Sequence, residues 1–111
     1  MHELSITQGI IEICLQHAAS RHITSVEVEI GVLSGVDPEA VAFCFEASTR
    51  ETPMHGARLR ISEVPATGSC QECGHDFRLL SLYDACPQCS SYRVTVMTGD
   101  EMRVREIEVA D

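Results

Sequence analysis

The stretch VEVEIGVL, residues 26–33, decides the fold that the rest of the chain has to satisfy. Every second residue is apolar, and the residues between them include Glu27 and Glu29. A period of two predicts a half-buried strand whose carboxylates face water. The side chains expected on its buried face are Val26, Val28, Ile30 and Val32.

Two other segments alternate in the same way: ARLRISEV, residues 57–64, and MRVREIEV, residues 102–109. Three such strands must share one sheet in order to bury their apolar faces. In residues 57–64, Leu59 and Ile61 are expected to point inward, and Arg58 and Arg60 outward. The second segment changes phase near Arg105 and Glu106, which predicts a β-bulge there. Because opposite charges favour neighbouring positions, we expect the glutamate strand to lie beside an arginine strand.

Two amphipathic helices are expected to cover the apolar face of this sheet. Residues 4–20 carry a stripe at helical spacing, with Ser5 and Gln8 as a capping box; its members are Leu4, Ile11, Cys14, Leu15 and Ala18. Residues 38–50 follow Asp37 as N-cap and Pro38 at the first helical position. The expected class is α+β, a small three-stranded sheet with two helices on one face.

Between the second and third strands, the composition changes to Cys, Gly and Ser. This insert is expected to be a zinc-ribbon-like β module. We therefore predict an α+β domain of residues 1–64 and 100–111, and a zinc-binding domain of residues 65–99. Residues 65–69 read as a small polar hinge between them. Within the insert, apolar residues of the loop would form a small core: Phe77, Leu79, Leu80, Leu82 and Tyr83.

The motifs CQEC, residues 70–73, and CPQC, residues 86–89, are the strongest chemical signal in the sequence. Two such turns can close a tetrahedral cage of four thiolates, which suits Zn²⁺. The predicted zinc ligands are Cys70, Cys73, Cys86 and Cys89. With all four positions filled by sulfur, the site is expected to be structural rather than catalytic.

Three other interpretations of these cysteines stay open at this stage. Two disulfides would suit an oxidising compartment, and a thiol redox pair would need one CxxC at the start of a helix. Iron in a rubredoxin-like site is the chemical alternative to zinc. His75 follows the first motif and could be a bystander, a hydrogen-bond donor to the ligands or a replacement ligand. Cys14 and Cys44 are expected to be small buried side chains of the helices.

The first three residues, MHE, form a second candidate metal site. The α-amine of Met1, the imidazole of His2 and the backbone nitrogens of His2 and Glu3 can form fused chelate rings. Nitrogen-rich square-planar or tetragonal sets select Ni(II) or Cu(II). An ordinary solvated chain end is the competing interpretation.

The charge and the chain start limit the class of partner. The net charge is −9, from 17 acidic and 8 basic residues. Such a surface repels nucleic acid phosphates and anionic membranes. No secretory signal and no apolar run long enough to span a bilayer are seen, which predicts a cytoplasmic protein with reduced thiols. A zinc module acting on nucleic acid or a transcription complex, and a thiol oxidoreductase, are the competing functions.

Taken in order, several segments resemble the HypA/HybF family of nickel metallochaperones for [NiFe]-hydrogenase maturation. They are MHELSI at the start, EIGVLSGVDPEAVAFCFE in the middle, the paired CxxC motifs and the closing REIEV. The resemblance covers essentially the whole chain.

The resemblance implies a non-enzymatic carrier with transient Ni(II) and structural Zn(II). It implies that His2 is the key nickel ligand, that backbone nitrogens at His2 and Glu3 take part, and that the Met1 amine completes the set. The Glu3 carboxylate would tune the site and the contact with the partner GTPase, HypB. Delivery would be to the hydrogenase large subunit, in some relatives also to urease, and a homodimer stays open. Many relatives carry His directly after the second CxxC, where this chain has Ser90.

Overall fold

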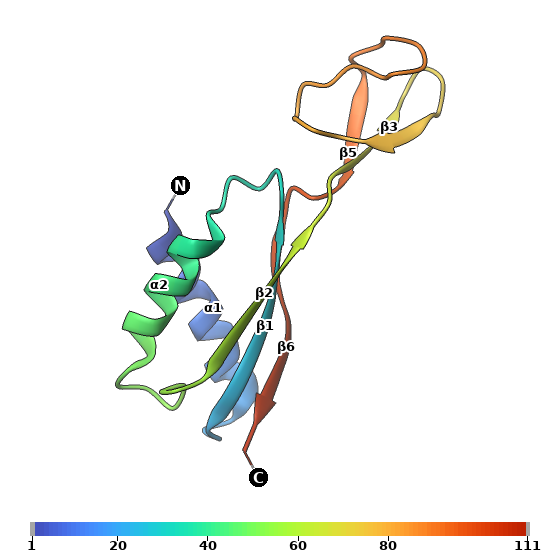
Figure 1. The fold of residues 1–111 in the computed structure, drawn as a ribbon. Coiled ribbons are helices and arrows are strands. Elements are labelled where there is room, and N and C mark those ends of the chain that lie inside the picture. The colour runs from blue at the N-terminus through green and yellow to red at the C-terminus, as the bar shows by residue number, and fades with distance from the viewer. Residues whose placement is uncertain (1, 111) are drawn as a thin grey trace.

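The computed structural model describes residues 2–110 and contains two helices and six strands. Their order is α1 (Glu3–Ala18), β1 (Ile23–Gly31), α2 (Pro38–Thr49), β2 (Arg58–Val64), β3 (Thr67–Cys70), β4 (Asp76–Arg78), β5 (Val94–Thr98) and β6 (Met102–Val109). One sheet, sheet A, has the order β2-β1-β6, and the other, sheet B, has the order β4-β3-β5. The chain leaves sheet A after β2 and returns in β6, so sheet B is inserted between them (Figure 1). The predicted α+β class with an inserted β module is confirmed.

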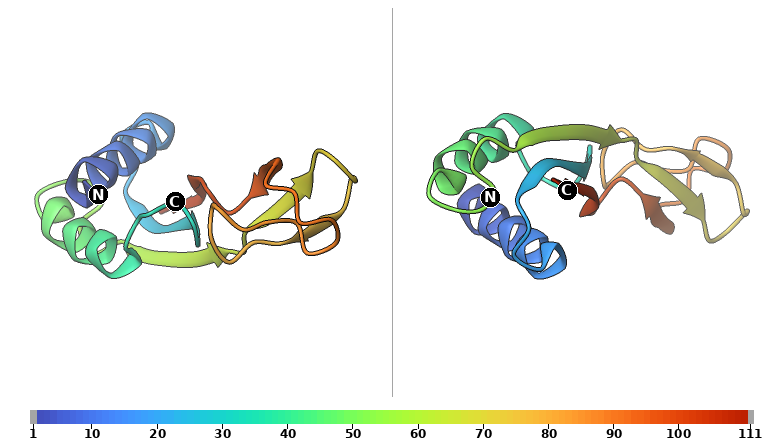
Figure 2. Two further views of the ribbon diagram at one scale, coloured as in Figure 1. Left: turned by 90° about the horizontal axis from the view of Figure 1, so that it is seen from above. Right: turned by 90° about the horizontal axis from the view of Figure 1, so that it is seen from below.

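Both helices lie on one face of sheet A (Figure 2). Sheet B projects from the side of the molecule that is away from the helices (Figure 2). The molecule is therefore elongated, with extents of 53 × 25 × 17 Å. The core between the helices and sheet A contains Ile10, Ile11, Cys14, Ala18, Ile23, Val26, Val28, Ile30, Val41, Phe45 and Met54. Within the described residues, no helix is both long and apolar enough to cross a bilayer.

β1 is the centre of sheet A, parallel to β2 and antiparallel to β6. Its predicted faces are correct, but the strand is Ile23–Gly31, so Val32 lies beyond its end and is 48% exposed rather than buried. On the wet face, Arg103 binds Glu29 at 2.6 Å and Arg105 binds Glu27 at 3.4 Å.

The predicted β6 bulge is confirmed. Glu27 pairs with Glu106 and Val28 with Val104, which leaves Arg105 as the extra residue.

The helix boundaries correct part of the sequence prediction. The Asp37 cap is confirmed, because its Oδ1 accepts a hydrogen bond from the Glu39 amide at 3.0 Å. The capping box of Ser5 and Gln8 is wrong, since α1 already begins at Glu3 and ends at Ala18, two residues early. The earlier start leaves Leu4 in the first turn, 52% exposed instead of buried.

The segment expected to be a hinge is instead a packed joint. Ala66 is fully buried, and residues 67–69 already belong to β3. Gly99 has a φ of +92°, and a Cβ there would lie 2.4 Å from the Cα of Ala66. The carbonyl of Gly99 accepts the Leu33 amide at 2.8 Å. A backbone hydrogen bond therefore connects the residue after β5 to the loop after β1.

The expected core of the insert is mostly wrong. Leu79 is buried, but Leu80, Leu82 and Tyr83 are 84%, 50% and 85% exposed. The cause is local, because the Asp84 carboxylate accepts the amides of Leu80 and Ser81 at 2.7 and 3.1 Å. Those bonds lower the pKa of Asp84 and hold the loop in a turn that directs its apolar side chains to solvent.

Candidate metal centres

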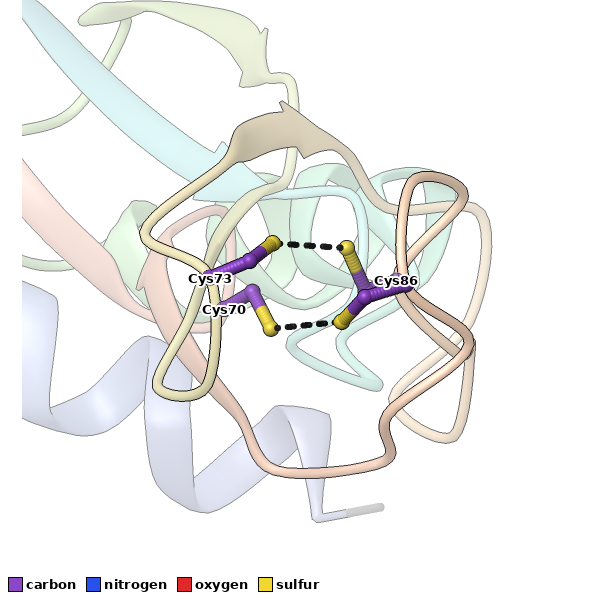
Figure 3. Close-up of side chains that lie close together, drawn as sticks. Cys70, Cys73 and Cys86 are labelled. Atoms are coloured by element: carbon purple, nitrogen blue, oxygen red, sulfur yellow. Dashed lines mark hydrogen bonds between the residues drawn. The ribbon is translucent and has the colours of Figure 1, made fainter.

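Four cysteines gather at the end of sheet B, one at the end of β3, one in the turn that follows it and two in the loop before β5. The Sγ atoms of Cys70, Cys73, Cys86 and Cys89 all lie within 4.8 Å of one another. Figure 3 shows Cys70 and Cys73 on one side of the cluster and Cys86 on the other. The Cys70–Cys89 and Cys73–Cys86 sulfur separations are 3.5 and 3.7 Å. A tetrahedral ion with metal–sulfur bonds of about 2.3 Å needs sulfurs about 3.8 Å apart. The cluster therefore has the donor type and the spacing of a Cys₄ metal site.

The two CxxC turns have the same backbone hydrogen bonds. In the first, the Cys70 amide binds the His75 carbonyl and the Gly74 amide binds the Cys70 carbonyl, both at 2.9 Å. In the second, the Cys86 amide binds the Ser91 carbonyl and the Ser90 amide binds the Cys86 carbonyl, both at 2.8 Å. The fifth residue of each turn is left-handed, with φ of +76° at Gly74 and +66° at Ser90. Ser90 thus occupies a position that favours glycine.

The thiols differ in how readily they ionise. A hydrogen bond from the Cys73 amide is the largest influence on Cys70, and it lowers the pKa of that thiol to about 7 against the effect of desolvation. At Cys89 the Ser91 amide favours the thiolate, but the Cys70 thiol and desolvation oppose it and raise the pKa to about 12.

The pKa of Cys73 is also raised, because desolvation and the thiols of Cys86 and Cys70 outweigh the amide of His75. Four thiolates in one place repel each other, and a divalent cation relieves that repulsion.

His75 lies beside this cluster without belonging to it. Among residues 2–110, the group of His, Cys, Asp and Glu side chains close enough to share an ion comprises the four cysteines. The His75 ring stacks on Phe77, with centroids 5.9 Å apart and planes 12° apart. The His75 carbonyl accepts the Cys70 amide and its ring stacks on Phe77, so both of its contacts are explained without a metal. This favours the interpretation that His75 is a bystander and not a metal ligand.

The second candidate site lies at the start of α1. Met1 is outside the described residues. His2 is exposed, and its carbonyl accepts the Ile6 amide at 3.0 Å, the first hydrogen bond of the helix. The amides of His2 and Glu3 precede that first bond, so they have no helix carbonyl to bind. The exposed His2 side chain therefore stands beside two backbone nitrogens that have no partner within the helix.

Glu3 connects this chain start to the loop before α2. Its Oε2 accepts the Asp37 amide at 3.3 Å, and its carbonyl accepts the Thr7 hydroxyl at 2.7 Å. The Asp37 carboxylate is used in capping α2. The first contact joins residues 34 positions apart, and no pattern in the sequence signals it. By contrast, the role of Ser90 could have been found by aligning the two CxxC motifs.

The other two cysteines are consistent with packing roles. Cys14 is fully buried, and its burial raises the pKa of the thiol to about 11. Cys44 is partly buried on α2, so only part of that prediction is correct.

Comparisons with known proteins identify relatives of the whole chain. Residues 1–109 match the family described as hydrogenase/urease nickel incorporation, metallochaperone, hypA. The hydrogenase maturation factor HypA of Geotalea uraniireducens is 53% identical over 109 residues, covering 98% of this chain and 99% of that protein. The factor of the same name from Geobacter metallireducens is 50% identical, with the same coverage.

Two solved structures are also similar to the chain. The solution structure of the Ni metallochaperone HypA from Helicobacter pylori has a TM-score of 0.71 and 31% identity, covering 98% of this chain and 97% of that one. A second solution structure, of a HypA protein, has a TM-score of 0.75 and 31% identity, with 99% and 97% covered.

Proposed function

The chain belongs to the HypA family of hydrogenase and urease nickel-incorporation metallochaperones, and from that premise we propose that it binds Ni(II) at its N-terminus and delivers it during maturation of [NiFe]-hydrogenase. The observation that carries the proposal is the start of α1. There an exposed imidazole stands beside two backbone amides that have no helix carbonyl to bind. No deep cavity or covering segment is needed for such a site, which suits transfer of its metal to another protein.

The proposed nickel set combines His2, Glu3 and Met1. The His2 imidazole and the backbone nitrogens of His2 and Glu3 supply a nitrogen-rich environment that selects Ni(II) or Cu(II). The Met1 amine would complete it. The Glu3 carboxylate contributes by holding the chain start against the Asp37 amide. Since the backbone nitrogens bind only after losing their protons, nickel affinity is expected to rise with pH.

The proposed role of Zn(II) is structural. Cys70, Cys73, Cys86 and Cys89 would fill its four positions, and a closed tetrahedral site leaves none for a substrate. The domain assignment follows: residues 1–64 and 100–111 form the nickel-binding domain and residues 65–99 the zinc-binding domain. We infer that the protein is not an enzyme, because the family to which it belongs is described as one of metallochaperones.

The proposed partners come from the family premise. They are the nickel-handling GTPase HypB and the [NiFe]-hydrogenase large subunit, with urease as a further client; whether the chain forms a homodimer stays open. All of these meet in the cytoplasm, where free thiols such as the six of this chain persist.

The decisive experiment is calorimetric titration of the zinc-loaded protein with Ni(II). His2→Ala is expected to lose nickel binding, and so is a chain with one residue added before Met1, since the amine is then displaced from the imidazole. Zinc content should be unchanged in both. His22→Ala is the matched control, because it removes another exposed imidazole outside the site. Nickel binding that survives both changes, or that His22→Ala also removes, would contradict the N-terminal site.

A further inference from the structure

The outer edge of β2 is an open sheet edge. β2 pairs with β1 on one side and ends sheet A on the other, within the described residues. Its seven residues would offer about 23 Å of extended backbone at about 3.3 Å per residue. Exposed edges of this kind accept an added strand, so proteins usually protect them with a bulge, a proline or charged side chains.

The two edges of sheet A differ in that protection. β6 contains the bulge at Arg105, and its Arg103 and Arg105 are bound to the glutamates of β1. β2 pairs with β1 in continuous register from Arg58 to Val64 and contains no proline. The edge at β2 is therefore straight as well as open.

A hollow lies on the wet side of β2. Its volume is about 320 Å³, and it is lined by Thr24, Ser25, Gly56, Arg58, Arg60 and Glu108. Among residues 2–110, neither Arg58 nor Arg60 forms an ion pair, since both β1 glutamates are bound by β6. In a chain of net charge −9, two neighbouring arginines thus remain free to bind carboxylates from outside.

A second hollow lies on the other side of the same strand, between β2 and α2. It has a volume of about 380 Å³ and a mixed lining, with apolar side chains on the sheet side and polar ones toward the end of α2; the residues are Ala42, Phe45, Glu46, Thr49, Arg50, His55, Gly56, Ala57 and Leu59. Side chains of a strand point alternately to the two faces of its sheet. A strand added beside β2 would therefore place one set of side chains in this hollow, against Phe45 and Leu59, and the other set beside the arginines.

We propose that the outer edge of β2 binds an extended segment of a partner protein in which apolar and acidic residues alternate. The backbone of that segment adds a fourth strand to sheet A. Its apolar side chains enter the hollow beside α2, and its carboxylates bind Arg58 and Arg60. A partner is favoured over a second copy of this chain, because two molecules of net charge −9 repel each other.

The test uses the zinc-loaded full chain and a fluorescent octapeptide of alternating valine and glutamate. Fluorescence anisotropy is expected to show binding, and hydrogen exchange to show new protection in residues 58–64. An octapeptide with four valines followed by four glutamates has the same composition and should not bind. The double variant Arg58→Gln, Arg60→Gln should weaken binding by roughly tenfold or more, since two charge-assisted partners are lost.

Two matched controls separate this site from general charge effects. Arg103→Gln, Arg105→Gln removes the same charge from the other edge and should keep the affinity. Ala42→Glu should block the helix-side hollow, whereas Ala47→Glu adds the same charge on the exposed face of α2 and should have little effect. Three results would overturn the proposal: the two double arginine variants weaken peptide binding equally, hydrogen-exchange protection appears on β6 instead of β2, or the peptide does not bind at millimolar concentration. So would protection of β2 by self-association without peptide.

Discussion

Sheet A and sheet B are stabilised in different ways. Sheet A and its helices share a core of eleven buried residues. In the inserted module, the buried apolar residues within the described chain are Ala66, Leu79 and the two cysteines Cys70 and Cys86. A side chain such as Leu79 contributes about 2 kcal/mol by burial, too little to order the module. One region therefore has its own apolar core, and the other is expected to depend on a metal ion held by its four cysteines.

The largest expected effect is loss of the module when its metal is removed. Structural zinc provides of order 10 kcal/mol in small domains. Cys86→Ser, or treatment with a strong chelator, should abolish hydrogen-exchange protection in residues 67–98 while β1 stays protected. Cys44→Ser is the control, because that cysteine lies on α2 outside the cluster. Cooperative loss of both sheets would show that the packed joint at Ala66 makes them one folding unit.

A mutation in the core of sheet A should destabilise that sheet and leave the zinc site of the inserted module intact. Ile30 is 1% exposed at the centre of the main core, so Ile30→Ala should lower the free energy of unfolding of sheet A by about 2–5 kcal/mol. Zinc content should remain stoichiometric. Val32→Ala is the control, since Val32 is 48% exposed and its truncation should cost little. Denaturant unfolding followed by circular dichroism, with metal analysis of the same samples, makes the comparison; a loss of zinc in Ile30→Ala would contradict it.

The two regions should also respond to pH in opposite directions. The raised pKa values of Cys73 and Cys89 mean that both thiols carry protons at neutral pH, which zinc must displace. Zinc affinity should therefore fall as the pH is lowered, and more steeply below about pH 7, where Cys70 also gains a proton.

In sheet A, burial raises the pKa of Cys14 to about 11, so the stability from its neutral thiol is complete below its ordinary pKa near 9 and is lost as pH rises toward 11. Zinc competition between pH 6 and 8, and thermal unfolding of zinc-loaded protein between pH 8 and 11, measure the two trends. Cys14→Ala should abolish the loss of thermal stability between pH 8 and 11. An unchanged loss in this variant would contradict the role of the Cys14 thiol.

The same contrast explains what the sequence could predict. Alternation in β1, β2 and β6 predicted sheet A, its faces and the Arg105 bulge, because apolar burial leaves a period in the sequence. The module lacks such a period, so the sequence predicts a core containing Leu80, Leu82 and Tyr83, which the structure shows to be exposed. For the cysteines, the spacing predicted a cluster that the structure contains. The contact of Glu3 with Asp37 has no sequence signal, because it depends on how α1 and α2 pack.

The smallest expected effect compares the two CxxC turns within the module. They have equivalent hydrogen bonds, but the left-handed position holds Gly74 in one and Ser90 in the other. A non-glycine residue there costs roughly 1 kcal/mol. Ser90→Gly should therefore strengthen zinc binding severalfold, and Gly74→Ser should weaken it by a similar factor. A Cβ at Gly74 meets nothing within 4 Å, so that change tests backbone strain without a steric clash. Competition with a chromogenic chelator measures both, and the double variant Gly74→Ser, Ser90→Gly should return the affinity to that of the parent chain. If Ser90→Gly instead weakens zinc binding, the Ser90 hydroxyl contributes to the site, and the two turns are not equivalent.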